Sequence, residues 1–122
     1  MLLRWLPHAF TVCQVAEYSK VRLDAPYCFL GKTVEENSLV CLTEDVPPNM
    51  ICREDGWCGF SIDGVLDFSL IGILSKIASV LAEARVGIFA VSTYNTDYIF
   101  LKSAQAQAAK QALRTAGYEI AE

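Results

Sequence analysis

A helical stripe of apolar residues between two apolar, strand-like runs constrains this chain more than any other feature. From residue 70 onward apolar side chains recur at spacings of three and four, on one face of a helix: Leu70, Ile73, Leu74, Ile77, Leu81 and Ala84. The flanking runs, at 59–65 and 86–94, are rich in residues that favour strands. The spacing therefore predicts a β-α-β unit whose helix has Asp67 or Ser69 as its N-cap.

Three more elements follow this unit. Only three residues separate the run at 86–94 from the next strand at 98–102, so the two strands are expected to form an antiparallel hairpin. The alanine-rich segment 104–116 predicts a second helix, the glycine after it suits a helix C-terminus, and 118–121 predicts a last edge strand. Because 86–94 is apolar on both faces, we expect it to be a central strand.

The order β-α-β-β-α-β across residues 56–122 predicts an α+β, ferredoxin-like domain, with two helices on one face of a four-stranded antiparallel sheet. Residues 1–55 predict strands at 9–16, 27–32 and 39–43 with little helix between them. They form a smaller, β-rich unit that repeats part of the later pattern. A charged link at 52–56 is expected to join the two units.

Composition excludes several classes of partner. The formal net charge of −4 and the scattered basic residues argue against a nucleic-acid ligand. The longest nearly uncharged apolar run, 68–80, is too short to cross a membrane, and the first ten residues do not resemble a signal peptide. We therefore expect a cytoplasmic protein. The mean hydropathy of +0.32 is high for a small soluble chain and favours a homodimer.

The cysteines predict neither a metal site nor a disulfide framework. There are five of them, an odd number, and no two have the C-x-x-C spacing. Free thiols, mostly buried, are the simplest interpretation. With His8 as the single histidine, no zinc ligand set is available, and nothing in the sequence implies a cofactor.

The ferredoxin-like fold serves many functions, so the candidate site must decide between them. An RNA-binding module needs exposed aromatic residues and a basic surface; Phe89, Tyr98 and Phe100 supply only the former. An acylphosphatase-like enzyme needs an arginine in the first strand-to-helix turn, and 67–72 contains none. No histidine lies near a serine or cysteine in a pairing that would make a nucleophile, so we predict a protein that is not an enzyme.

The third class is a small-molecule sensor, and it rests on a resemblance. The stretch DFSLIGILSKIASVLAEARVGIFAVSTYNTDYIFLK, residues 67–102, resembles an ACT domain of the branch found in short two-unit bacterial proteins and in the CASTOR arginine sensors. Its most specific part is STYNTDY at 92–98. In the first half of the chain, KTVEENSLVCLTEDVP at 32–47 is similar to the same branch. The resemblance covers most of residues 9–103.

The resemblance implies that a small amino acid binds at an interface between two ACT units. Carried over by position, the ligand-binding residues are Phe68, Ser69, Leu70, Ile71 and Gly72 in the first loop, and Thr93, Tyr94, Asn95, Thr96 and Asp97 at the facing strand end. Elementary chemistry agrees, because the amides of a helix N-terminus attract a ligand carboxylate. A glycine at position 72 permits close approach to the backbone, and the Asp97 carboxylate could pair with an ammonium group.

Two alternatives stay open at the level of sequence. Asn95 and Asp97 are common formers of hairpin turns, and Gly72 could serve only to pack the helix tightly on a strand. The whole chain could equally be a protein–protein interaction module, in which the same apolar surfaces bind a partner chain and no ligand is involved.

Overall fold

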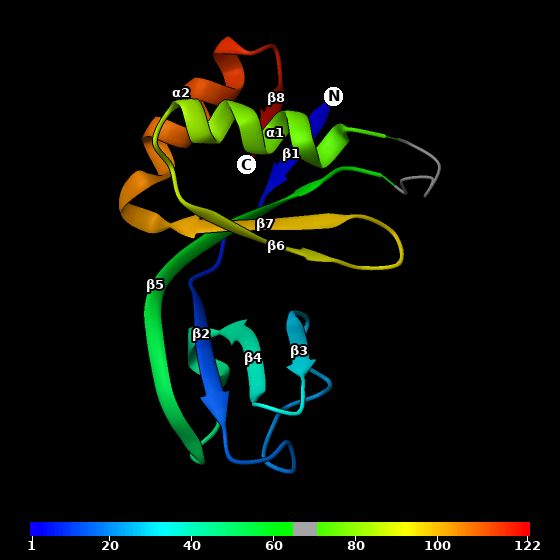
Figure 1. Ribbon diagram of the computed structural model, residues 1–122. Coiled ribbons are helices and arrows are strands. Elements are labelled where there is room, and N and C mark those ends of the chain that lie inside the picture. Colours follow the sequence, from blue (N-terminus) through cyan, green and yellow to red (C-terminus); the bar gives the residue numbers. More distant parts are fainter. Residues whose placement is uncertain (65–70) are drawn as a thin grey trace. The chain divides into compact units, whose positions relative to one another are not determined.

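The computed structural model describes residues 1–64 and 71–122, which form two compact units. Unit 1 comprises Met1–Pro7 and Cys58–Glu122, and unit 2 comprises His8–Trp57 (Figure 1). The chain has the predicted α+β, ferredoxin-like fold. A division into separate domains at residues 55 and 56 stays a prediction, and the first seven residues lie in unit 1.

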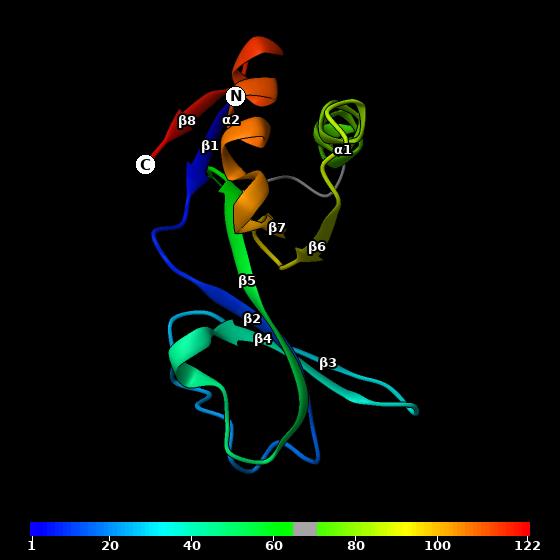
Figure 2. The ribbon, with the colours of Figure 1, turned by 90° about the vertical axis from the view of Figure 1, so that its left-hand side faces the viewer.

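Unit 1 is a five-stranded sheet with two helices. Its strand order is β6-β7-β5-β1-β8, and both helices lie on the same side of these strands (Figure 2). The elements are β1 (Leu2–Trp5), the last part of β5 (Met50–Ile62), α1 (Ile73–Glu83), β6 (Ile88–Ser92), β7 (Asp97–Lys102), the 3-10 turn η2 (Ser103–Gln105), α2 (Ala106–Thr115) and β8 (Glu119–Ala121). The predicted β-α-β-β-α-β order of this region is therefore confirmed.

One strand of unit 1 was not expected from the sequence. Strand β1 lies between β5 and β8, with Leu3 opposite Ile62 in the antiparallel ladder and opposite Ile120 in the parallel one. Leu3 and Trp5 point into the core, whereas Arg4 is exposed and pairs with Asp63 at 3.2 Å. The run LLRW has a single polar residue, Arg4, so it lacks the strict alternation that predicts a strand.

The position of β6 is a second difference. Within the residues that the structure describes, β6 pairs with β7 alone and forms an edge of the sheet, so the prediction of a central strand was wrong. Its burial is mixed, with Ile88 and Phe89 half-buried and Ala90 exposed. The Phe89 ring stacks on that of Phe100 at 5.0 Å between centroids. That contact explains why an edge strand carries apolar residues on both faces.

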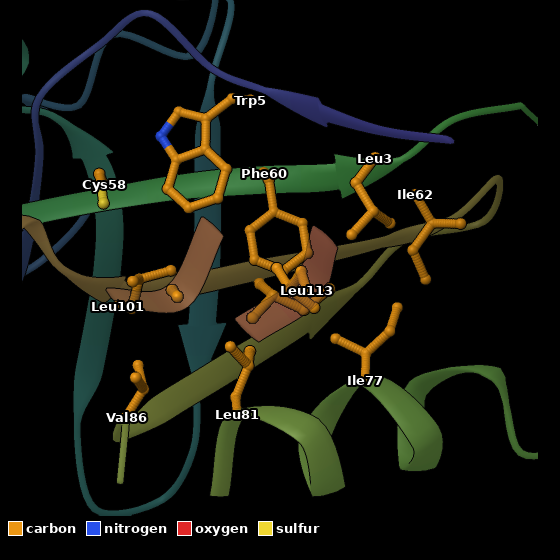
Figure 3. Packing of buried hydrophobic residues seen from close by; sticks show 12 residues of the cluster. Leu3, Trp5, Cys58, Phe60, Ile62, Ile77, Leu81, Val86, Leu101 and Leu113 are labelled. Carbon is orange, nitrogen blue, oxygen red and sulfur yellow. The ribbon is translucent and has the colours of Figure 1, made fainter. Parts of the chain in front are cut away.

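The core of unit 1 lies between the sheet and the two helices (Figure 3). Phe60 of β5 is fully buried and stacks on Trp5 of β1, with 5.2 Å between the ring centroids. Ile77 and Leu81 of α1 are also fully buried, and so is Leu113 of α2. The helical stripe seen in the sequence is thus the core-facing side of α1.

The C-terminus of α2 is capped by a glycine, as expected. Gly117 has a φ of +99°, and its N–H donates to the carbonyl of Arg114 at 3.0 Å. The N–H of Tyr118 donates to the carbonyl of Leu113 at 3.0 Å. These two bonds satisfy carbonyls that the helix leaves unpaired and turn the chain into β8.

A buried lysine joins α2 to β8. Lys110 is only 7% exposed, and its Nζ lies 4.7 Å from the centroid of the Trp5 ring. The ammonium donates to Glu122 Oε1 at 2.6 Å, and Arg114 donates to Oε2 at 3.3 Å. The hydrogen bond from Lys110 and its charge, together with Arg114, hold the pKa of Glu122 below its usual value.

Replacing Glu122 by glutamine is expected to destabilise the protein at neutral pH and not in strong acid. A carboxyl whose pKa is lowered on folding stabilises the native state above its unfolded pKa, and this contribution is lost as the pH falls through the folded pKa. Urea unfolding of Glu122→Gln and of the parent at a series of pH values would measure the difference. The exposed Glu119 of β8, three residues earlier, is the control for the change from glutamate to glutamine.

Unit 2 is a four-stranded sheet with the order β3-β4-β2-β5. Its elements are β2 (Phe10–Val15), β3 (Cys28–Lys32), β4 (Asn37–Leu42), the 3-10 turn η1 (Thr43–Asp45) and the first part of β5. The strands predicted at 9–16, 27–32 and 39–43 are confirmed. No helix forms between β2 and β3, and the segment there packs Tyr18 and Val21 against the apolar cluster of the sheet.

The charged stretch 52–56 was predicted to be a link between the two units. It is instead part of β5. It pairs with β2, for example Arg53 opposite Cys13, at an edge of the unit 2 sheet where polar side chains reach solvent. A register shift follows at Gly56, whose φ of +85° suits a β-bulge. The buried Thr11 Oγ1 lies 2.6 Å from Asp55 Oδ1 and 2.9 Å from Thr43 Oγ1, which satisfies its hydroxyl.

The five cysteines are free thiols. Cys13, Cys41 and Cys58 are buried, whereas Cys52 is exposed. Burial raises the pKa of the Cys41 thiol to about 12, and the neighbouring Cys13 adds to the effect. At neutral pH Cys41 is therefore protonated and behaves as a small apolar side chain. In the described part of the chain, no helix is long and apolar enough to cross a membrane.

Candidate functional site

The β6–β7 hairpin of unit 1 is held by its own side chains. The N–H of Thr93 donates to the Thr96 carbonyl at 2.8 Å, and the Thr93 hydroxyl donates to the same carbonyl at 2.9 Å. Ser92 Oγ donates to Asp97 Oδ1 at 2.6 Å, where β6 ends and β7 begins. Asn95 and Tyr94 form the exposed tip, and the Tyr94 side chain is 82% exposed.

One further bond joins this hairpin to the end of β5. The Thr96 hydroxyl donates to the carbonyl of Ile62, the last residue of β5, at 2.8 Å. The two residues are 34 positions apart in sequence. The hairpin turn is thereby tied to the point where the chain leaves the sheet toward α1.

Among the described residues, no side chain caps the N-terminus of α1. Its N-cap is Gly72, with a φ of +82° in the left-handed region, and the helix begins with the bond from Lys76 N–H to the Gly72 carbonyl at 2.9 Å. No acidic residue lies in the first turn. The amides of the first turn have no intrahelical partner, and together with the helix dipole they favour an anion. Asp67 and Ser69, the predicted N-caps, lie outside the described residues.

The described candidate residues gather at one end of unit 1. The start of α1, the end of β5 and the tip of the β6–β7 hairpin lie at the same end (Figure 1). Ile71, just before the N-cap, is 92% exposed. Phe68, Ser69 and Leu70, which the sequence also assigned to the site, lie outside the described residues.

Replacing Gly72 by alanine is expected to lower the free energy of unfolding by about 1–2 kcal/mol. An added Cβ would meet no described residue within 4 Å, so the expected cost comes from the left-handed backbone. Gly87 is the matched control, because a Cβ there also meets nothing and its φ is not positive. Gly87→Ala should be neutral or slightly stabilising in the same chemical denaturation experiment. Equal losses in both variants would contradict this account.

Unit 2 contains a hairpin with the same turn chemistry. The Thr33 N–H donates to the Glu36 carbonyl at 3.0 Å, and the Glu36 N–H donates to Thr33 Oγ1 at 3.2 Å. Asn37 Nδ2 donates to the carbonyl of Ala16, immediately after β2, at 3.0 Å. This bond ties the hairpin to the end of β2, as the bond from Thr96 ties the other hairpin to the end of β5, although Asn37 aligns with Asp97. In each hairpin a threonine precedes a polar residue by four positions: Thr33 precedes Asn37, and Thr93 precedes Asp97. This shared spacing is the sequence signal that could have revealed that the two hairpins are equivalent.

A separate hollow of about 380 Å³ lies on unit 2. Gln14, Ser38 and Cys52 are among the residues that line it, and none of the predicted site residues that the structure describes does. In residues 1–64 and 71–122, no group of three or more His, Cys, Asp or Glu side chains could hold a metal ion. We therefore take the start of α1 and the β6–β7 hairpin, and not this hollow, as the candidate site.

Several solved structures resemble this chain in fold. Protein Atu0741 of Agobacterium tumefaciens has 24% identity and a TM-score of 0.85, covering 98% of this chain and 91% of its own. The regulatory subunit of aspartate kinase from Thermus thermophilus has 12% identity and a TM-score of 0.62, covering 90% and 93%. Protein VC0802 of Vibrio cholerae has 19% identity and a TM-score of 0.68, covering 91% and 85%. No curated protein matches the chain.

At these identities the solved structures establish the fold alone. The family follows from a match of sequence: the model of the ACT domain covers residues 53–115, more than half of the chain. That range includes α1, the β6–β7 hairpin and Gly72. The chain is a member of the ACT domain family.

Proposed function

We propose that this protein is a non-enzymatic regulatory protein that binds a small amino acid through unit 1. The observation that carries the proposal is the uncapped N-terminus of α1 behind Gly72, at the same end of the unit as the hairpin that carries Asp97. A chain of the ACT family with regulatory neighbours such as the aspartate kinase subunit fits this role. Within the family, we assign it to the two-unit branch of the CASTOR arginine sensors, as a cytoplasmic homodimer.

Each end of an amino acid has a matching group. The amides of the first turn of α1 would receive the ligand carboxylate, because the positive end of the helix dipole favours an anion there. Gly72 has no side chain, so a ligand can approach these amides closely. Asp97 would receive the ammonium group; its Oδ1 already accepts the Ser92 hydroxyl, which fixes the carboxylate, and Oδ2 is the oxygen for the ligand.

The remaining predicted residues complete the site in this proposal. Thr93 and Thr96 hold the hairpin in shape through their mutual hydrogen bonds, and Tyr94 and Asn95 form its exposed tip. Phe68, Ser69, Leu70 and Ile71 precede the helix in the sequence and would contact the ligand side chain. The ligand would lie at an interface of ACT units or of subunits, as the family resemblance implies.

Thermal unfolding against each of the twenty amino acids at millimolar concentration tests the proposal. A ligand that binds only the folded state raises the melting temperature. A shift with one or a few amino acids would identify the ligand. If none of the twenty produces a shift, the chain does not bind a common amino acid, and the proposal is wrong.

A protein–protein interaction module is the second candidate. It is favoured by the exposure of two apolar side chains at this end of unit 1, Tyr94 at 82% and Ile71 at 92%. Such residues are enriched where a partner chain binds. The double variant Ile71→Ser, Tyr94→Ser separates the two functions. If the chain is an interaction module, the variant should change the mass of the complex. If the chain binds an amino acid, it should change the shift in melting temperature that the amino acid causes.

A further inference from the structure

Three thiols meet in the apolar cluster of the unit 2 sheet. They are Cys13 of β2, Cys41 of β4 and Cys28 of β3, which come from three neighbouring strands. Cys13 and Cys41 are buried, whereas Cys28 is half-buried and therefore within reach of a small reagent. The Cys41 thiol donates a hydrogen bond to Cys13, and the charge of Cys28 acts on Cys41 from the other side. The site proposed on unit 1 uses none of these thiols.

The strand register determines which two thiols face each other directly. Cys28 lies opposite Cys41 in the β3–β4 ladder. Cys13 lies opposite Leu39 in the β2–β4 ladder, so it is only a diagonal neighbour of Cys41. The Cα atoms of diagonal neighbours are about 7–8 Å apart, whereas those of a disulfide are usually about 4.4–6.8 Å apart. Cys28, and not Cys13, is therefore the suitable disulfide partner of Cys41.

The hydrogen bonds of the hairpin show that Cys28 and Cys41 form a non-bonded pair. The N–H of Thr33 donates to the Glu36 carbonyl at 3.0 Å, so these two residues are a bonded pair of the β3–β4 ladder. Bonded and non-bonded pairs alternate along such a ladder, which makes the pair of Cys28 and Cys41 non-bonded. The Cα atoms of a non-bonded pair are about 4.5 Å apart and the side chains are close, as a disulfide requires.

The ladder on the other side of β4 leads to the same result. The N–H of Thr43 donates to the Ala9 carbonyl at 3.0 Å, so the β2–β4 ladder has a bonded pair there. By the same alternation, Cys41 is in a bonded pair with Thr11. Because the N–H and carbonyl of Cys41 point toward β2, they do not point toward β3. Two independent hydrogen bonds therefore agree on how Cys41 faces Cys28.

We propose that Cys28 and Cys41 are a site of reversible oxidation, at which a small disulfide such as glutathione disulfide converts the two thiols into a cross-strand disulfide. The Cys28 thiolate attacks one sulfur of glutathione disulfide, which forms a mixed disulfide and releases one glutathione thiolate. The Cys41 thiolate then attacks the Cys28 sulfur, and the second glutathione leaves. The two glutathione thiolates take up the two protons that the cysteines have lost. Two protein thiols are thereby oxidised, and one glutathione disulfide is reduced to two molecules of glutathione.

Burial slows this exchange without opposing it at equilibrium. Burial, with the charge of Asp45, raises the pKa of the Cys28 thiol, and burial raises the pKa of Cys41 to about 12. The thiolate is the attacking species, so both steps are slow at neutral pH. The position of the equilibrium depends on the strain in the disulfide, which the direct pairing keeps low. The composition at equilibrium, and not the rate, is therefore the quantity to measure.

The proposal is tested by equilibrating the folded full chain in excess glutathione disulfide. The background variant Cys52→Ala removes the exposed thiol, which would otherwise form mixed disulfides. Free thiols are blocked in acid, and peptides are then mapped by mass spectrometry. We expect one intramolecular disulfide between Cys28 and Cys41, with a loss of two hydrogens in mass and recovery of both thiols in excess glutathione. A chain that stays reduced, or one that joins Cys13 to Cys41, would overturn the proposal.

Two alanine variants provide the matched comparison. Cys28→Ala should abolish the disulfide, whereas Cys13→Ala, which removes a thiol of the same cluster, should leave it intact. Loss of the disulfide in Cys13→Ala alone would contradict the pairing. The disulfide closes a loop around the whole β3–β4 hairpin, so oxidation should raise the melting temperature by several degrees in the background variant and not in Cys28→Ala. If the oxidised chain melts no higher than the reduced one, the bond is strained and the register argument is wrong. None of these outcomes depends on amino-acid binding by unit 1.

Discussion

Replacing Phe60 by alanine is expected to lower the free energy of unfolding by about 3–5 kcal/mol. The side chain is fully buried in unit 1, between the sheet and the two helices, and its ring stacks on Trp5 (Figure 3). Truncation removes apolar contact area and leaves a cavity that the surrounding side chains fill only in part. Urea unfolding followed by circular dichroism and by tryptophan fluorescence would measure the loss.

The control for this prediction is another aromatic residue of the same unit. Tyr94 is 82% exposed at the hairpin tip, so Tyr94→Ala should change the free energy of unfolding by less than about 0.5 kcal/mol. The comparison separates burial from aromatic character. A loss of less than about 1 kcal/mol for Phe60→Ala would mean that the core of unit 1 is not organised around this ring.

The elements that the sequence predicted well are those with a long and regular period. Helix α1 shows its apolar stripe over more than three turns, and the glycine after α2 marks that helix's end. Strand β1 has only four residues, of which Leu3 and Trp5 face the core. Its place between β5 and β8 depends on partners some sixty to one hundred and twenty residues along the chain, and local patterns carry no information about such pairings.

The two errors in the strands have the same cause. The environment of a strand depends on which strands lie beside it in the sheet. The local sequence does not identify these neighbours. The charged residues of 52–56 suggested a link, but an edge position allows them to reach solvent while β5 continues through them. Conversely, the apolar residues of β6 suggested a central strand. Strand β6 nevertheless lies at the edge of the sheet, where the Phe89 ring stacks on that of Phe100.

The candidate site was predictable in part. The motif at 92–98 and Gly72 pointed to the same end of the fold, and the structure gathers them there. The bond from Thr96 to Ile62 could not be foreseen, because it joins residues 34 positions apart and depends on how the hairpin meets β5. In the described residues α1 begins behind Gly72, whose backbone is left-handed, whereas the predicted N-caps Asp67 and Ser69 lie outside them. Whether the site residues bind a ligand stays a prediction.

The second large effect concerns the ligand. An amino acid at about 100 times its dissociation constant should add about 2.7 kcal/mol to the free energy of unfolding, or several degrees in melting temperature for a chain of this length. In Asp97→Ala this increment should fall to near zero, because the ammonium group would lose its carboxylate partner while the helix amides remain. The measured quantity is the difference between unfolding with and without the ligand, since Asp97→Ala also removes the bond from Ser92 and lowers the baseline.

The equivalent hairpin of unit 2 provides the control that decides the interpretation. Asn37 occupies the position of Asp97 there, and its amide is bound to the carbonyl of Ala16. Asn37→Ala should therefore lower the baseline stability and leave the ligand increment unchanged. If Asn37→Ala abolishes the increment and Asp97→Ala does not, the amino acid binds at unit 2 and the assignment of the site to unit 1 is wrong. Loss in both variants would mean that one ligand is held by both hairpins, which requires the ligand to lie where two ACT units meet.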